Sequence, residues 1–225
     1  MTEPVKYYTA KAVRELDRLA IEEHHIPGFE LMQRAGNAAY SALRKEWPLA
    51  TQLIVCCGTG NNGGDGFIIA ALARAGGLKV DTWLVGSPAS IKGDALKAMD
   101  YAQAQQVAIH DASGLSGFNA VSANTVIVDA LLGTGLTGEV REGVRKMIDA
   151  INSSALPVLA VDIPSGLCSD TGAVLGACVK AAMTVTFIGR KLGLIKGSGP
   201  ALAGKVVFAD LGVPAEIYQK VAASQ

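Results

Sequence analysis

A glycine-rich stretch directly after an apolar run is the feature that most constrains how this chain can fold. Residues 53–57 are all apolar, and residues 58–66, which follow, contain five glycines, two asparagines and an aspartate. Residues 67–74 then have the composition of a helix. A strand, a glycine-rich turn and a helix bring unpaired backbone N–H groups and the positive end of a helix dipole to one point. This order predicts a site for a phosphate-containing ligand.

Strand and helix patterns alternate through the rest of the chain, after two helices expected at 9–23 (with Thr9 as N-cap) and from Pro27 to about Trp47. The expected strands are 53–57, 79–85, 107–109, 125–129, 157–161, 183–188 and 205–209, and the later helices are 65–75, 92–105, 142–151 and a short one after Pro214. Alternation of this kind predicts an α/β class with a three-layer Rossmann-like fold, in which helices flank a central, mostly parallel sheet. A length of 225 residues suits a single domain, 1–225.

Charge and composition exclude several classes of protein. Lysine plus arginine and aspartate plus glutamate both number 20, so no overall field favours nucleic acid or an anionic membrane. The N-terminus has no apolar signal region, and the late apolar stretch 181–188 is too short to cross a bilayer. The four cysteines lack metal-site spacing and suit buried free thiols. We expect a soluble, cytoplasmic protein.

A nicotinamide-dependent dehydrogenase is the first alternative, because residues 58–63 satisfy G-x-G-x-x-G. A dinucleotide fold of that type places an acidic residue at the tip of its second strand, where it binds the ribose hydroxyls. Here the second strand ends in Leu84-Val85-Gly86-Ser87, and Asp81 lies near its start. The dehydrogenase interpretation is therefore weakened.

Three polar loops follow three of the expected strands, namely 58–66, 129–139 and 162–166. Ligands of parallel sheets bind beyond the carboxyl ends of the strands, so we expect these loops to converge on one site. Asn62, Asp129 and Ser165 offer one hard oxygen each, which suits a weakly charged cation. Asp129 could equally be a turn aspartate, and spacing alone leaves both interpretations open.

Asp162 is the candidate acid–base residue, because it emerges at the tip of an apolar strand. Ser165 could instead be a hydrolase nucleophile, but none of the three histidines has a motif around it that marks a catalytic base. Lys191 is a possible second acid–base group at a strand end. An ordinary solvated loop lysine is about as good an interpretation of that residue.

Several segments together resemble the YjeF N-terminal domain, the family of the NAD(P)H-hydrate epimerases. The segments that carry the resemblance are 31–36, 58–66, 128–135, 161–166 and 187–194, in order along nearly the whole chain. The run Asn61-Asn62-Gly63-Gly64-Asp65-Gly66 is the most specific of them.

The resemblance implies an isomerase that repairs nicotinamide cofactors by interconverting the R and S epimers at C6 of hydrated NADH and NADPH (NADHX and NADPHX). A separate dehydratase, specific for the S form, would then restore the cofactor. The resemblance also implies a homodimer, and no dehydratase domain is expected in this stretch of sequence. A nucleotide-binding sensor or a partner-docking module on the same fold is the alternative.

The resemblance assigns site residues by position. Asp162 would contact the reacting end of the substrate as general acid and base, and a potassium ion would be held by Asn62, Asp129 and Ser165. The residues implied to bind the hydrated dinucleotide are Asn61, Asn62, Gly63, Gly64, Asp65, Gly133, Thr134, Gly135, Leu136, Thr137, Gly138, Glu139 and Asp162.

Overall fold

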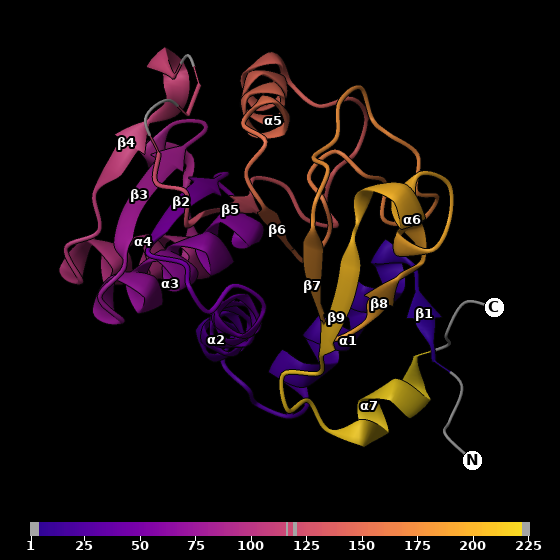
Figure 1. Ribbon diagram of the computed structural model, residues 1–225. Coiled ribbons are helices and arrows are strands. Elements are labelled where there is room, and N and C mark those ends of the chain that lie inside the picture. The colour runs from indigo at the N-terminus through magenta and orange to yellow at the C-terminus, as the bar shows by residue number, and fades with distance from the viewer. Residues whose placement is uncertain (1–4, 116, 119–120, 222–225) are drawn as a thin grey trace.

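The computed structural model describes residues 5–115, 117–118 and 121–221, and within them a parallel sheet of seven strands forms the centre of the molecule (Figure 1). The strand order is β4-β3-β2-β5-β6-β7-β9. The strands are β2 (Gln52–Cys57), β3 (Lys79–Leu84), β4 (Ile109–Asp111), β5 (Thr125–Ala130), β6 (Val158–Val161), β7 (Met183–Phe187) and β9 (Lys205–Ala209). Each neighbouring pair is parallel, so the carboxyl ends of all seven strands lie at one edge of the sheet.

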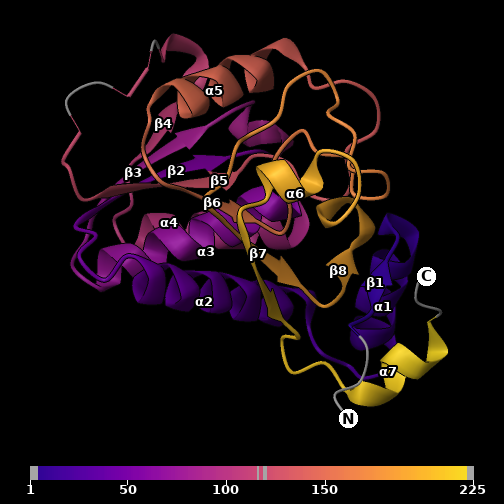
Figure 2. The same cartoon turned by 45° about the vertical axis from the view of Figure 1, so that its right-hand side comes forward.

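Helices cover both faces of this sheet, with α5 on one face and α2, α3 and α4 on the other (Figures 1 and 2). The helices are α1 (Ala10–Glu22), α2 (Gly28–Glu46), α3 (Asn61–Ala75), α4 (Gly93–Ala104), α5 (Glu142–Ser153), α6 (Gly199–Leu202) and α7 (Ala215–Lys220). Short 3₁₀ turns lie at Pro88–Ser90, Ala112–Gly114 and Leu192–Leu194. The expected three-layer α/β fold is confirmed.

The side chains of β2 alternate between the two apolar layers. Leu53, Val55 and Cys57 pack into the layer under α2, α3 and α4, whereas Ile54 and Cys56 pack into the layer under α5. All six residues of β2 are buried, as a strand covered on both faces must be. The continuous apolar run therefore reflects a central strand. The thiols of Cys56 and Cys57 within it are free and buried.

A second, two-stranded sheet joins the beginning of the chain to its last third. Strand β1 (Tyr7–Tyr8) pairs in parallel with β8 (Arg190–Lys191), and Tyr8 lies opposite Lys191. Helix α1 follows β1 directly. Thr9 caps this helix, because its hydroxyl accepts a hydrogen bond from the amide of Ala12 at 3.2 Å.

The structure moves one important element boundary. We expected α3 to begin at Asp65, after a glycine-rich turn, but the helix begins at Asn61 and Gly60 is its N-cap. Four residues of the stretch are thus the first helical turn. Strand β4 is also shifted: it was expected at 107–109 and lies at Ile109–Asp111. Among the described residues, no helix is long and apolar enough to cross a membrane.

Candidate active site

A cavity of about 1010 Å³ lies at the carboxyl edge of the main sheet. Its walls come from the segments that follow β2, β3, β5, β6 and β7, and from the inner faces of α1 and α2. This volume is at the upper end of the usual range for small-molecule sites. The three polar loops named from the sequence all contribute to this cavity or to the layer beneath it.

The glycines after β2 allow α3 to pack unusually close to the sheet. A Cβ atom on Gly58 would lie 2.0 Å from the carbonyl oxygen of Leu131, and one on Gly63 would lie 1.9 Å from the carbonyl oxygen of Gly58. By contrast, no atom lies within 4 Å of the corresponding point on Gly60, which lines the cavity. The first turn of α3 is therefore pressed against the loops, and its free N–H groups are at the cavity wall.

Most of the expected substrate-binding residues fall into two groups, and Gly138, with φ = 75° and no atom of the described residues within 4 Å of its Cβ position, belongs to neither. Asn61, Asn62 and Asp65 line the cavity, as do Gly133, Thr134, Gly135, Leu136, Thr137 and Glu139 from the loop after β5. Gly63 packs inward, as does Gly64, where a Cβ atom would lie 2.6 Å from the sulfur of Met32. These two glycines serve the close approach of α3.

Asp129 and Ser165 form a buried polar junction behind the cavity wall, and both are 0% exposed. The carboxylate of Asp129 accepts hydrogen bonds from the Ser165 amide at 2.8 Å, the Ser165 hydroxyl at 2.6 Å and the Leu131 amide at 3.3 Å. Burial raises the pKa of Asp129 to about 6 even though these hydrogen bonds oppose the shift. The junction ties the loop after β5 to the loop after β6.

Asn62 completes the set of three oxygen ligands expected from the sequence. Its side-chain oxygen and nitrogen are buried and have no hydrogen-bond partner among the described residues. The amide lies against Gly133, where a Cβ atom would come 3.6 Å from the side-chain oxygen. A buried polar group without a partner is costly, and an oxygen-seeking ligand would remove that cost.

These residues fit a monovalent cation. The hydrogen bonds to Asp129 come from neutral groups, and no basic side chain among the described residues pairs with its carboxylate. The carbonyl oxygen of Leu132, 3.2 Å from the Ser165 hydroxyl, adds a further oxygen. The described residues contain no cluster of three or more histidine, cysteine, aspartate or glutamate side chains that could hold a metal ion. One carboxylate among neutral oxygens suits a weakly charged ion.

Asp162 and Lys191 form an ion pair at the base of the cavity. The Lys191 ammonium contacts the Asp162 carboxylate and donates a second hydrogen bond to the Phe187 carbonyl at 2.9 Å. The Lys191 side chain is 1% exposed and that of Asp162 is 14% exposed. The interpretation of Lys191 as a solvated loop lysine is therefore wrong.

Two tight turns hold this ion pair. Asp162 has φ = 69°, and the amide of Ile163 donates to the carbonyl of Val161 across it. Ile188 has φ = 59°, and the amide of Gly189 donates to the carbonyl of Phe187 across it. Each is a γ-turn with a positive φ, a rare and strained arrangement that is held only where the surroundings enforce it. The turns end the adjacent strands β6 and β7 and direct Asp162 and the β8 segment into one corner.

Two further acidic residues, Asp65 and Asp17, line the cavity near the ion pair, and the sequence identified only Asp65. Asp65 comes from α3, and Asp17 comes from α1. Burial is the main cause that raises the pKa of Asp17 to about 6 and that of Asp65 well above its usual range. In both cases Asp162 raises the pKa and Lys191 lowers it, so the four side chains form one electrostatic cluster.

Asp17 could have been found from its spacing. Val13, Asp17 and Ile21 are separated by four residues each, which places all three on one face of a helix. All three line the cavity, as does Arg14. An acidic residue between two apolar residues on the same helix face was the sequence signal for a site residue.

The loop after β3 carries no acidic residue at its tip. Val85, Gly86 and Ser87 line the cavity there, whereas Asp81 accepts a hydrogen bond from Gln52 at 2.8 Å within the strand region. The ribose-binding acid of a dehydrogenase is thus missing from this position, as expected.

Comparison with known proteins gives a consistent set of matches. Residues 28–193 match the family model described as the YjeF-related protein N-terminus. A bifunctional NAD(P)H-hydrate repair enzyme from Coxiella burnetii is 44% identical over 95% of this chain and 43% of its own length. The chain therefore spans less than half of that relative.

Shorter relatives match over most of their length. An NAD(P)H-hydrate epimerase from Limosilactobacillus fermentum is 36% identical over 90% of this chain and 95% of its own length. One from Legionella pneumophila (strain Paris) is 32% identical over 95% and 80%, respectively. The crystal structure of the yeast protein ynu0 has the same fold, with a TM-score of 0.82, 18% identity and coverage of 96% of this chain and 93% of that one.

Proposed function

This chain belongs to the family of the YjeF-related protein N-terminus, and from that premise we propose that it is an NAD(P)H-hydrate epimerase. The observation that carries the proposal is the buried Asp162–Lys191 pair in a large cavity whose other wall is the glycine-rich start of α3. One part of the cavity offers acid–base groups, and another offers backbone N–H groups for an anion. A hydrated dinucleotide requires both.

The substrate would be the R or S form of NADH or NADPH hydrated at C6 of the nicotinamide ring. Its pyrophosphate would lie near Asn61 and Gly60, at the N-terminus of α3, where N–H groups face the cavity. Its altered ring would lie near Asp162. No hydride is transferred in an epimerisation, which agrees with the lack of an acidic residue at the tip of β3.

The reaction would proceed by loss and return of water. The C6 hydroxyl is bonded to a carbon next to the ring nitrogen, so the nitrogen lone pair can assist its departure once the oxygen is protonated. Water then adds to the other face of the ring and gives up a proton. Asp162 would exchange a proton with the C6 oxygen on its own side of the ring, and its negative charge would favour the cationic intermediate. Lys191 would hold the Asp162 carboxylate in place.

We propose potassium as the cation of this site, held by Asn62, Asp129 and Ser165. Support comes from the unpartnered Asn62 amide oxygen and from the uncompensated Asp129 carboxylate described above. When bound, potassium would supply positive charge and oxygen coordination where the loops after β5 and β6 meet.

We also propose that the protein is a homodimer and that a dehydratase specific for the S epimer uses its product. The family resemblance supports the dimer, and the bifunctional relatives support the dehydratase. Light scattering coupled to size-exclusion chromatography tests the dimer, because a single species of about 23 kDa would contradict it.

The epimer assay on wild type and Asp162→Asn tests the proposed activity. Pure R hydrate should convert to the R and S mixture in the presence of wild type, and Asp162→Asn should lower kcat by about 10²–10⁴-fold. Asp149→Asn is the matched control, because Asp149 is an exposed residue of α5 and should leave kcat unchanged. An R sample that wild type leaves unchanged would exclude an epimerase. Tight binding of the hydrate without turnover would favour the sensor or docking module.

A further inference from the structure

Epimerisation places a requirement on the site that Asp162 alone does not meet. One face of the ring loses water and the other face gains it, so a proton must be given on one side and taken on the other. Asp162 is held in one position by Lys191 and by a strained turn, so it would face one side of a bound ring. The cavity should therefore contain a second acid–base group on another wall.

We propose that Asp17 is this second catalytic carboxyl and that it serves the face of the nicotinamide ring opposite Asp162. The inference rests on the proposed epimerase function. Asp17 comes from α1, whereas Asp162 comes from the tip of β6, so the two approach the cavity from different elements. Both side chains line this cavity.

The position of α1 is fixed beside the ion pair. Strand β1 pairs with β8, and Tyr8, two residues before α1, lies opposite Lys191. The first amide of α1 donates to Asp170 at 2.6 Å. Val13 packs so closely on Gly189 that a Cβ atom there would lie 3.1 Å away. Asp17 follows Val13 by one helical turn, so it is held over the same corner.

The charges around Asp17 suit it to carry the proton that the second acid–base group must exchange. In the part of the chain that the structure describes, the carboxyls of Asp17, Asp65 and Asp162 share one buried cation, Lys191. Like charges in a buried site do not all ionise. Lys191 contacts Asp162 directly, whereas burial raises the pKa of both Asp17 and Asp65. The pKa of about 6 for Asp17 lets it both give and take a proton near neutral pH.

The proton balance closes without a further reactant. In the R-to-S direction one carboxyl protonates the C6 oxygen, the C6–O bond breaks and water leaves. A water on the other face then bonds to C6 and gives its proton to the other carboxylate. One proton passes from one carboxyl to the other, and the reverse reaction returns it. No oxidant or reductant is required.

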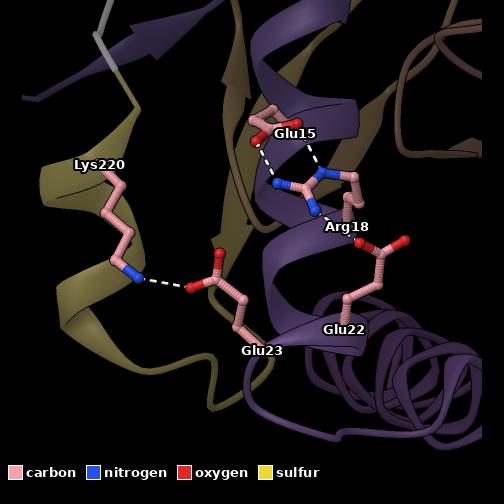
Figure 3. A network of polar contacts seen from close by, with 5 residues as sticks. All are labelled: Glu15, Arg18, Glu22, Glu23 and Lys220. Atoms are coloured by element: carbon pink, nitrogen blue, oxygen red, sulfur yellow. Dashed lines mark hydrogen bonds and ion pairs between the residues drawn. The ribbon is translucent and has the colours of Figure 1, made fainter.

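The opposite face of α1 provides a matched control. There Arg18 lies between Glu15 and Glu22, and Glu23 contacts Lys220 of α7 (Figure 3). Glu22 is exposed, so Glu22→Gln removes a carboxyl from the same helix without touching the cavity.

The test is the epimer assay with Asp17→Asn, Asp17→Glu and Glu22→Gln. We expect Asp17→Asn to lower kcat by at least 100-fold with KM within about threefold of wild type. Asp17→Glu should keep at least a tenth of the activity, and Glu22→Gln should keep all of it. A structural role would instead raise KM or prevent folding, and either result would overturn the proposal.

The pH profile gives a readout that separates catalysis from structure. If Asp17 is the acid in one direction, kcat in that direction falls as pH rises above about 6, and Asp17→Asn loses this limb. The charged groups that act with it are Asp65, Asp162 and Lys191, with Arg14 on its own helix and Tyr218 on α7. If wild type did not convert the R hydrate at all, the proposed epimerase function would be refuted. Active wild type with an equally active Asp17→Asn would refute only the role of Asp17.

Discussion

Lys191 is a buried cation, and among the described residues it pairs with one carboxylate, that of Asp162. Replacing Lys191 by methionine would remove the cation and leave Asp162 without its partner in a poorly solvated corner. Loss of one member of a buried pair costs about 3–5 kcal/mol. Because Asp162 keeps some contact with solvent, we expect Lys191→Met to lower the free energy of unfolding by about 3 kcal/mol, measured by urea denaturation.

Lys205 provides the matched control for this prediction. It also pairs with a carboxylate, Glu46, but its side chain is 61% exposed. Exposed pairs contribute at most about 1 kcal/mol, so Lys205→Met should have a small effect. Equal losses for the two methionine variants would contradict a structural role for the buried pair.

The sequence predicted individual residues where a local pattern marks them. Asp162 follows an apolar strand, and a strand tip in a parallel sheet is where a ligand binds. Lys191 could not be chosen over a solvated lysine, because its partner is 29 residues away and the two strained turns that join them have no sequence signature. Asp17 was missed although its four-residue spacing from Val13 and Ile21 marks one face of the helix, and the packing of α1 shows that this face meets the cavity.

Helix α3 depends on glycine for contact rather than for flexibility. The Cβ of Gly63→Ala would meet the Gly58 carbonyl oxygen at 1.9 Å, and backbone atoms cannot move aside as a side chain can. Overpacking costs about 1–3 kcal/mol, and more where backbone is displaced. We expect Gly63→Ala to lower the free energy of unfolding by at least 3 kcal/mol or to prevent folding.

Gly60→Ala is the comparison for this change. Gly60 has open space around it and a φ of −98°, which alanine adopts readily. The cost should be about 1 kcal/mol, the usual loss when an N-cap becomes alanine. If urea midpoints fell equally for the two variants, low helix propensity alone would explain the glycines and close packing would not.

Most elements of the fold were predicted to within about two residues, because the sheet is built from continuous apolar runs. The start of α3 was not predicted, since asparagine and glycine are poor helix formers and tertiary contacts alone hold them helical. Strands β1 and β8 were missed as well. Two-residue strands have no periodicity that a sequence can display.

Potassium binding should appear as stability of the whole molecule, because a ligand that binds only the folded state raises its melting temperature. If the site is filled at about 100 times its dissociation constant, the gain is about 2.7 kcal/mol, or roughly 5–10 °C for a chain of this size. The measurement compares melting in potassium chloride and in tetraethylammonium chloride at equal ionic strength. Asn62→Leu should abolish the difference, and equal melting of wild type in both salts would exclude the cation.

The pairing of β1 with β8 joins Tyr8 to Lys191, which are 183 positions apart in the chain. During synthesis the glycine-rich start of α3, Asp65 and Asp17 all leave the ribosome long before Lys191 exists. The corner that holds the ion pair can close only after the last third of the chain has emerged and captured the N-terminal segment. Contacts between such distant residues form slowly. The site therefore becomes competent to act on a substrate only after Lys191 has left the ribosome and β8 has paired with β1.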